Sequence, residues 1–466
     1  MTRSNAVTAV GPTDRSLSDH QAVPARPARP AGTPSLKRLA VTGTAWTLIG
    51  HIASQLIRMG GHVVVAQFLG PAVFGIMAMA DVVMTGLRMF SDMGTGPSII
   101  QHKRGDDPDF LNTAWTVNVI RHGGLFLAAC LLAWPVAAYR DQPLLLWIIP
   151  VGALAVLVRG FISTAPATLH RHLRIRTLEL FELSREVVRN AGKVVFAILL
   201  RNVWALVIGG LIGGVYSLVV SHTVISQGRN RFCWDRDALK HLVRFGRWIF
   251  IATALTFVIG QGDKIVLAGF LSDADLGLYA IAFTWALAIP QAVRAVTNRV
   301  LFPVYSLIAD RSVPHVRRKI LLTRLLLLLA TLPPLCVFAI GGGLFVRTIY
   351  PSEFHGAGWI LQLLAFGGIF RIVEVTMSPI LLAKGDSYRH MLVLISQAVL
   401  LLLAVAVGGC LAGYAGVVVG IALSHLLNYP ILGFAIKKYG VWTPLFDLAF
   451  MYGFGLPTMA AISYFD

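Results

Sequence analysis

The sequence predicts an all-α polytopic membrane protein, built from two parallel-repeat six-helix bundles around a central cavity with 12–14 transmembrane helices. Three observations predict this fold class: the composition, the placement of basic residues and an internal repeat. The 466 residues are 56% hydrophobic and 13% charged, and the mean hydropathy is +0.71. Soluble domains carry about 25% charged residues, and a membrane span needs about 20 apolar residues. The chain therefore has room for a dozen spans joined by short loops.

Hydropathy divides the chain into five predicted parts. These are a disordered basic cytoplasmic tail (1–40), an N-terminal six-helix bundle (41–227), a cytoplasmic linker (228–241), a C-terminal six-helix bundle (242–436) and an extra C-terminal transmembrane segment (437–466). The tail contains "VPARPARPAGTPS" and no cleavable signal peptide, so the first span should direct membrane insertion. The predicted helices are 41–69, 73–100, 112–138, 143–164, 178–200, 203–227, 242–270, 276–308, 318–346, 357–383, 388–411 and 414–436, with a shorter thirteenth near 445–464.

Basic residues alternate between the two sides of these spans. The tail and every second loop hold 23 Lys and Arg, whereas the other side holds three, Arg140, Arg201 and Arg347. This asymmetry places the N-terminus in the cytoplasm. The net charge of +18 is explained by these loops, and no motif for nucleic-acid binding accompanies it. The four cysteines have no metal-ligand spacing, so we expect neither a metal nor a cofactor.

The internal repeat appears when the chain is compared with itself at an offset of 202 residues. Residues 46–80 then align with 248–282 without a gap, and twelve of the 35 positions are identical, among them Trp46/Trp248 and Gly75/Gly277. Six predicted helices separate the copies, so both halves have the same orientation in the membrane. Such parallel repeats are typical of transporters that alternate access to a site between two bundles.

Polar side chains form stripes on several of these apolar helices, and each stripe follows one helical face. We expect these faces to line the central cavity, because a polar stripe facing lipid is costly. Our candidates for a cationic substrate-binding set are Arg58, Arg88, Arg121, Lys264, Arg294 and Arg371. The candidates for coupling or structural ion pairs are Asp81, Asp92, Asp263 and Glu374, and the candidate polar cavity residues are His51, Gln55, His62, Gln291 and Asn298.

Each stripe also has a purely structural interpretation. Arg121 and Arg159 could extend from helix ends toward the membrane surface. Asp81, Arg88 and Asp92 could neutralise one another, and the adjacent Asp263 and Lys264 could pair with other helices. The charged residues of 178–200, among them Glu182, Arg185, Glu186, Arg189 and Lys193, form neighbours at i+3 and i+4 and read as a salt-bridged cytoplasmic end.

Two stretches resemble bacterial polysaccharide repeat-unit flippases, the group that includes colanic acid and succinoglycan exporters. The first, 66–119, contains "LGPAVFG", "FSDMG", "SIIQ" and "LNT"; the second, 263–308, contains "GLY" and "RVLFP". The resemblance covers about residues 40–440. Met93 stands where the family commonly has Leu, and the chain ends after a thirteenth helix where members often have fourteen.

This resemblance implies the multidrug/oligosaccharidyl-lipid/polysaccharide exporter fold and no enzymatic activity. It implies flipping of undecaprenyl-pyrophosphate-linked repeat units across the bacterial inner membrane, with cationic cavity residues holding the pyrophosphate. Asp92 and the Asp263–Lys264 pair match the family by position, whereas Arg58 and Arg88 follow from the stripes. Expected partners are the lipid-linked glycan, the bilayer and polysaccharide polymerase or export proteins. A multidrug antiporter of the same fold, a glycan polymerase or ligase, and an assembly scaffold are the alternatives. Short outer loops disfavour the enzyme.

Overall fold

The computed structural model describes residues 36–91, 95–225, 230–235, 237, 249–306 and 314–465. Every regular element among them is a helix. They are α1 (Leu36–Ala66), α2 (Pro71–Ser91), α3 (Thr95–Gln101), α4 (Pro108–Arg140), α5 (Leu145–Gly160), α6 (Ala165–Arg171), α7 (Ile175–Leu200), α8 (Trp204–Val220), the π-helix Ser221–Ile225, α10 (Ile249–Ala268), α11 (Asp273–Ser306), α12 (Pro314–Ile349), the 3-10 helix Ser352–Phe354, α13 (Ala357–Met377), α14 (Pro379–Ala383), α15 (Ser387–Lys437) and α16 (Pro444–Phe465).

The helices follow the predicted spans, with differences at their ends. Residues 1–35 of the predicted tail lie outside the described residues, and α1 already begins at Leu36. The predicted helices 388–411 and 414–436 form the single element α15, which has non-helical backbone at Ala412 and Gly413. Seven described helices are long and apolar enough to cross a membrane, or eight if the bent pair α5–α6 is one span. Helices with a charged stripe, such as α7, are not among these seven, because their charged residues make them too polar.

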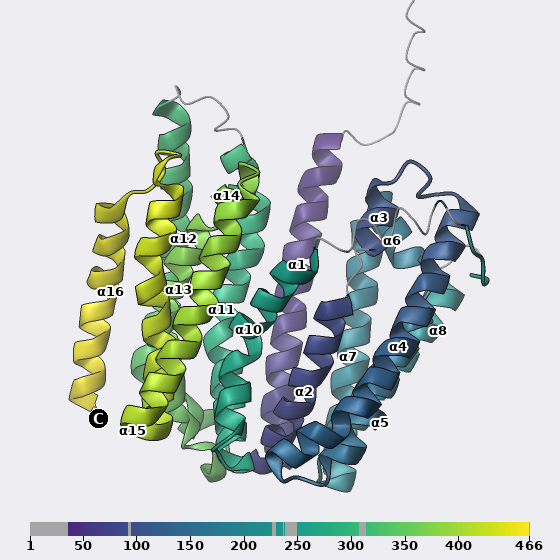
Figure 1. Ribbon diagram of the computed structural model, residues 1–466, viewed down its shortest axis with the longest axis horizontal. Coiled ribbons are helices and arrows are strands. Elements are labelled where there is room, and N and C mark those ends of the chain that lie inside the picture. Colours follow the sequence, from purple (N-terminus) through teal and green to yellow (C-terminus); the bar gives the residue numbers. More distant parts are fainter. Residues whose placement is uncertain are drawn as a thin grey trace, which may run out of the picture.

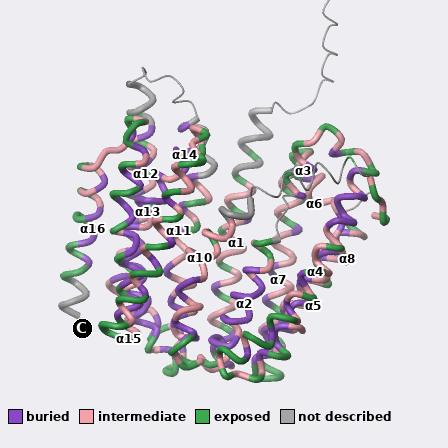
Figure 2. Tube along the Cα trace, viewed as in Figure 1, coloured by how far each residue is buried: buried purple, intermediate pink, exposed green. Residues whose placement is uncertain are grey.

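The helices gather into two groups that lie side by side (Figure 1). We call α1–α8 with the π-helix the N-lobe, and α10–α16 the C-lobe. Buried positions follow the faces where helices meet, and exposed positions follow the outer faces (Figure 2). Large apolar side chains on those outer faces, such as Leu131 (78% exposed) and Leu411 (81% exposed), suit contact with lipid.

The two lobes meet where α2 packs against α10 and α11. At this crossing Gly75 faces Gly277 without room for a side chain. A Cβ atom on Gly75 would lie 1.8 Å from the carbonyl oxygen of Asp273, and a Cβ on Gly277 would lie 1.9 Å from that of Pro71. The contact is reciprocal because Pro71 and Asp273, like the two glycines, are 202 residues apart in the chain. Two backbones can approach this closely at glycine alone.

A second constant spacing relates the later helices of the lobes. Leu145 and Ala357 begin α5 and α13, and Ile175 and Ser387 begin α7 and α15; each pair is 212 residues apart. The same spacing joins Arg201 (φ 49°), which ends α7, to Gly413 (φ 55°), which breaks α15. A duplicated six-helix unit with a ten-residue insertion in its second copy would leave this pattern.

The thirteenth predicted segment is α16, and a buried ion pair joins it to the C-lobe. Arg324 of α12 contacts Asp447 of α16 at 2.5 Å, and both side chains are 0% exposed. The Tyr429 hydroxyl donates to the second carboxylate oxygen of Asp447 at 3.1 Å. Burial of two charges is costly unless each is paired and hydrogen-bonded, so this arrangement fixes where α16 docks.

Candidate functional site

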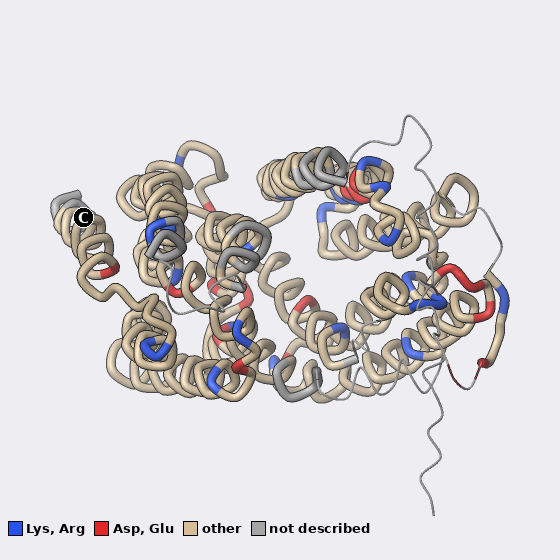
Figure 3. The backbone as a smooth tube through the Cα atoms, turned by 90° about the horizontal axis from the view of Figure 1, so that it is seen from above, with Lys and Arg blue, Asp and Glu red and all other residues tan. Residues whose placement is uncertain are grey.

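The N-lobe contains a partly open cavity between α2, α5, α7 and α8, with an empty volume of about 1000 Å³ that includes its opening to solvent. Small and apolar residues form much of its wall. Five basic side chains and one acidic side chain also line it: Arg88, Arg159, Arg185, Arg189, Lys193 and Asp81. Figure 3, which looks along the helices, shows Lys and Arg positions in both lobes. The cavity therefore carries an excess of positive charge inside a lobe that is otherwise apolar.

Two of these cations are neutralised on their own helix. Arg185 forms an ion pair with Glu182, and Arg189 forms one with the buried Glu186. These are the i+3 neighbours predicted from the sequence. Arg159 and Lys193, in contrast, form no hydrogen bond or ion pair with another described residue. Nearby carboxylates still act on both charges, Glu182 on Arg159 and Asp81 with Glu186 on Lys193.

The stripe of α1 faces α7 and is absent from the lining of this cavity. Arg58 donates a hydrogen bond to Gln55 and lies within electrostatic range of Glu186 and Arg189. His62 lies within electrostatic range of Lys193, and its ring centre is 6.1 Å from the ring centre of Phe74. His51 occupies the same stripe and is half-buried.

Four further candidates lie apart from this cavity or outside the described residues. Arg121 of α4 is half-buried and lies within electrostatic range of His122. Gln291 of α11 is exposed. Asp92 lies outside the described residues, and the side chain of Asn298 does too.

The C-lobe holds a second cavity, with an empty volume of about 1060 Å³ between α10, α11, α13 and α15. The charged and polar side chains that line it are Thr256, Arg294, Arg371, Glu374, Ser378, His390, Gln397 and Asn428. Arg371 also lines a smaller neighbouring cavity of about 330 Å³ together with His425. The cations predicted to share one cavity thus divide between two lobes.

Glu374 is fully engaged within the C-lobe. His425 Nδ1 lies 2.9 Å from one of its carboxylate oxygens, and Asn428 donates to the other at 2.8 Å. Arg294 and Arg371, in contrast, make no hydrogen bond or ion pair with any described residue. The electrostatic field of Asp263 and Glu374 reaches Arg371 without a direct contact.

Asp263 and Lys264, adjacent on α10, contact different partners. The Tyr279 hydroxyl donates to one carboxylate oxygen of Asp263, whose other oxygen is buried and has no partner among the described residues. Lys264 donates to Gln261 at 3.1 Å, and its ammonium lies 4.4 Å from the ring centre of Phe283. Both residues therefore sit inside the C-lobe instead of pairing with each other.

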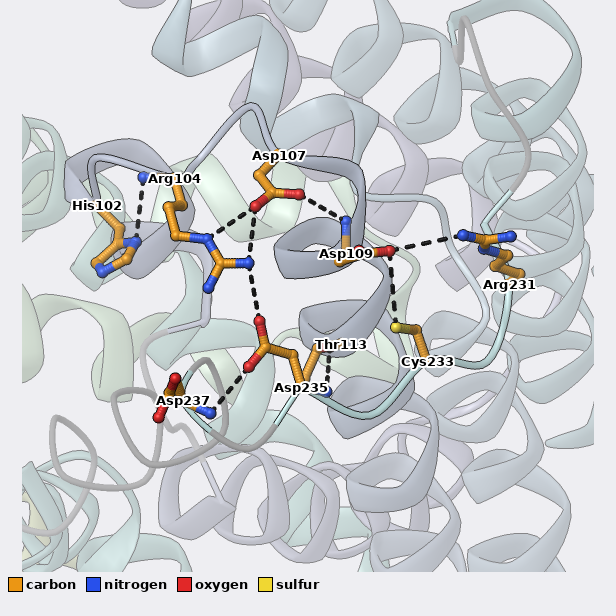
Figure 4. A network of polar contacts seen from close by, with 9 residues as sticks. All are labelled: His102, Arg104, Asp107, Asp109, Thr113, Arg231, Cys233, Asp235 and Asp237. Atoms are coloured by element: carbon orange, nitrogen blue, oxygen red, sulfur yellow. Dashed lines mark hydrogen bonds and ion pairs between the residues drawn. The ribbon is translucent and has the colours of Figure 1, made fainter.

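Residues 230–235 of the predicted linker are fastened to α4. The backbone N–H groups of Arg231, Cys233 and Asp235 donate to side chains of Asn112, Thr116 and Thr113, each at 3.1 Å. Arg104 lies between Asp107 and Asp235 and pairs with both, at 2.7 and 2.8 Å (Figure 4). The first part of the linker thus belongs structurally to the N-lobe.

Ion pairs outside the spans also stabilise the loops between the helices. The hydrogen bond from Arg104 lowers the pKa of Asp107, which caps α4 by accepting from the Asp109 N–H. In the C-lobe, Lys438 contacts Asp386 at 2.5 Å and Tyr439 donates to it at 2.7 Å. These hydrogen bonds lower the pKa of Asp386 from 3.8 to about 2.

The candidate set drawn from the sequence omitted Arg159, Arg189 and Lys193. Two signals could have found them. Glu182, Glu186, Arg189 and Lys193 have the same spacing (i, i+4, i+7, i+11) as the stripe that was recognised on α1. Arg159 and the candidate Arg371 are 212 residues apart, which is the spacing that relates the later helices of the two lobes.

Comparison with known proteins identifies relatives over most of the chain. Residues 64–358 match the family model described as "Polysaccharide biosynthesis protein". The lipopolysaccharide biosynthesis protein WzxC of Escherichia coli (strain K12) is 23% identical over 434 residues, covering 88% of this chain and 86% of that protein. The teichuronic acid biosynthesis protein TuaB of Bacillus subtilis (strain 168) is 21% identical over 354 residues, covering 76% and 73%.

Solved structures share the fold. The lipid II flippase MurJ in an inward closed conformation superposes with a TM-score of 0.68 at 12% identity, covering 91% of this chain and 92% of that one. An inward-facing transporter of the multidrug resistance MATE family of the MOP superfamily gives 0.62 at 12% identity, covering 85% and 98%. The chain is a multi-span membrane protein with this fold, and it belongs to the family of polysaccharide biosynthesis proteins.

Proposed function

We propose that this protein is a flippase. It moves undecaprenyl-pyrophosphate-linked oligosaccharide repeat units from the cytoplasmic to the periplasmic leaflet of the bacterial inner membrane, for exopolysaccharide or O-antigen synthesis. Its N-terminus is cytoplasmic, in agreement with the placement of basic loops. Family membership and the fold shared with a lipid flippase support this proposal.

The observation that carries the proposal is the positive cavity of the N-lobe. Arg159 and Lys193 line it without an ion pair or hydrogen bond to any described residue, and Arg88 lines the same space. Isolated cations in an apolar surrounding are costly, so they persist where an anion binds. A pyrophosphate suits guanidinium forks and an ammonium point charge. Arg58 and Arg121 would extend this positive field along the path of the head group, and Asp81 would hold Lys193 in register.

Alternating access would follow from rocking of the lobes about their crossing. The lobes touch through α2, where Gly75 and Gly277 allow close backbone contact. The lipid tail can stay in the bilayer while the polar head passes between or through the lobes. Asp263, Asp92 and Glu374 are the groups we propose for coupling or for structural ion pairing during this motion.

A multidrug antiporter of the same fold is the second candidate, because MATE transporters share the fold. The charge of the N-lobe cavity argues against a cationic drug, since five basic side chains face one carboxylate there. A cationic substrate would be repelled by such a lining.

Mass spectrometry of lipid-linked glycans in a strain lacking this protein tests the proposal. The strain is complemented with wild type, Arg58→Ala, Arg159→Gln or the control Arg347→Gln, which removes an exposed charge from the end of α12. We expect the deletion to accumulate a complete repeat unit in the cytoplasmic leaflet and to lose polymer. Wild type and the control restore export, and Arg58→Ala and Arg159→Gln do not. Unchanged export in the deletion strain, with no second flippase present, rejects the proposal in favour of the antiporter.

A further inference from the structure

Among the described residues, four cations that line a cavity without an ion pair or hydrogen bond form two sets, one in each lobe. Arg159 and Lys193 line the N-lobe cavity, and Arg294 and Arg371 line the C-lobe cavity. None of the described residues lines both cavities. Arg159 and Arg371 occupy corresponding positions on α5 and α13, at the 212-residue spacing that relates these helices. Each lobe therefore presents its own anion-binding group, and one pyrophosphate accounts for one of the two sets.

The two cavities differ in the rest of their linings. Apart from its charges, the N-lobe cavity is lined by glycines and apolar residues, with Ser217 as its uncharged polar side chain. The C-lobe cavity is lined by hydroxyl, amide and imidazole groups, from Thr256, Ser378, His390, Gln397 and Asn428. The first lining suits a compact anion, and the second offers the hydrogen-bonding groups that sugar hydroxyls require.

Much of the hydrogen-bonding capacity in the C-lobe cavity is unused. The side chains of Ser378 and Gln397 make no hydrogen bond with described residues, and the buried His390 Nδ1 has no partner there. Both carboxylate oxygens of Glu374 already form hydrogen bonds, one with His425 and one with Asn428. Burial of His390 Nδ1 without a partner costs free energy, and the half-buried Ser378 and Gln397 can still form hydrogen bonds, so the cavity suits a polar ligand. Two guanidinium groups beside them are suited to a carboxylate.

We propose that the C-lobe cavity binds the glycan of the lipid-linked substrate, and that Arg294 and Arg371 recognise a carboxylate on an acidic sugar. This inference rests on the proposed function, because it assumes that the pyrophosphate occupies the N-lobe. Ser378, His390 and Gln397 contact the sugar hydroxyls. The protein therefore selects repeat units that contain a uronic acid or an equivalent carboxylate.

Binding of three synthetic lipids to the full-length protein in nanodiscs tests this. The probes are undecaprenyl pyrophosphate, the same lipid carrying cellobiose, and the same lipid carrying cellobiouronic acid, in which a carboxylate replaces one hydroxymethyl group. The variants are Arg371→Gln, Arg294→Gln, Gln397→Leu and Arg159→Gln, with Arg347→Gln as a charge-matched control outside both cavities. Thermal unfolding of each variant shows whether it is folded, and Arg371→Lys replaces Arg371→Gln if the latter is not.

We expect wild type to bind the acidic disaccharide lipid about tenfold more tightly than the neutral one, as one charge-assisted contact predicts. Arg371→Gln and Arg294→Gln abolish that preference and leave the affinity for undecaprenyl pyrophosphate unchanged, and Gln397→Leu weakens both glycolipids. Equal affinities for the two glycolipids overturn the inference, as does a loss of undecaprenyl pyrophosphate binding in Arg371→Gln. Failure of the proposed function is separate: wild type then does not bind undecaprenyl pyrophosphate, or Arg159→Gln binds it normally.

Discussion

Arg159 and Arg189 line the same cavity, yet replacing each with glutamine should have a different main effect. Arg159→Gln should lower the affinity for the lipid, and Arg189→Gln should lower the stability of the fold. Arg159 makes no hydrogen bond or ion pair with a described residue, so Arg159→Gln breaks no such contact of the folded protein. In the binding mode that we propose, it removes a charge-assisted hydrogen bond to the pyrophosphate, which contributes about 1.5–3 kcal/mol. Affinity for undecaprenyl pyrophosphate should fall about 10- to 150-fold, with little change in thermal stability.

The main effect of Arg189→Gln should be a lower stability of the folded protein. Its partner Glu186 has a side chain that is 4% exposed, and it accepts from both Arg189 and Asn190. Loss of the guanidinium leaves a buried carboxylate without its counter-charge, and breaking such a pair costs about 3–5 kcal/mol. The double variant Arg189→Gln/Glu186→Gln should recover much of that stability.

Thermal unfolding in detergent and lipid binding in nanodiscs measure the two effects separately. Equal losses of stability in Arg159→Gln and Arg189→Gln would show that Arg159 has a structural partner. Normal binding by Arg159→Gln would refute the assignment of the pyrophosphate to the N-lobe cavity.

The lobe crossing predicts that Gly75→Ala abolishes export, because the new Cβ would lie 1.8 Å from a carbonyl oxygen of α11; Gly60→Ala, whose Cβ would meet nothing within 4 Å, should export normally. Asp447→Asn leaves Arg324 buried without its counter-charge, at a cost of about 3–5 kcal/mol, and should lower the unfolding temperature in detergent; an unchanged temperature contradicts the role of the pair in docking α16. The pKa of Asp386 is lowered to about 2 in the folded protein, so its ionised form stabilises the fold above pH 3.8 and this contribution is lost as the pH falls toward 2. Asp386→Asn should therefore melt below wild type at pH 6 and level with it at pH 2, and a difference that persists at pH 2 would assign the effect to shape and not to charge.

Much of the helical framework could be predicted because hydropathy and loop composition act locally. The predicted span 112–138 corresponds to α4, which starts at Pro108 behind the capping side chain of Asp107. The predicted boundary between 411 and 414 corresponds to a backbone break, and Gly413 adopts positive φ there. The docking of residues 230–235 on α4 could not be predicted, because it depends on Asn112, Thr113 and Thr116 meeting a segment more than a hundred residues away.

The division of the cations between two lobes could not be predicted from the sequence either. A polar stripe identifies the face of a helix that avoids lipid, but it does not identify what that face meets. The stripe of α1 turns toward α7, so Arg58 and His62 are placed among the charges of a neighbouring helix. The stripe of α7 was assigned to a salt-bridged helix end. The predicted ion pairs of Arg185 and Arg189 do form. These two arginines nevertheless line the cavity, as does Lys193 of the same helix.

Arg159 and Arg371, which are 212 residues apart in the chain, lie in different electrostatic settings, and this difference agrees with the two binding tasks that we propose for the lobes. Arg159 faces a lining of small apolar residues and further cations, with Glu182 as a nearby carboxylate. Arg371 lies among amide and hydroxyl groups in the fields of one cation, Arg294, and two carboxylates, Glu374 and Asp263. The first setting strengthens attraction for any compact anion, because nearby positive charges add to it. The second weakens that general attraction and leaves directed hydrogen bonds to decide what binds. An ancestral anion site retained in one lobe and tuned by carboxylates in the other would give a transporter that holds the shared pyrophosphate strongly and discriminates between glycans.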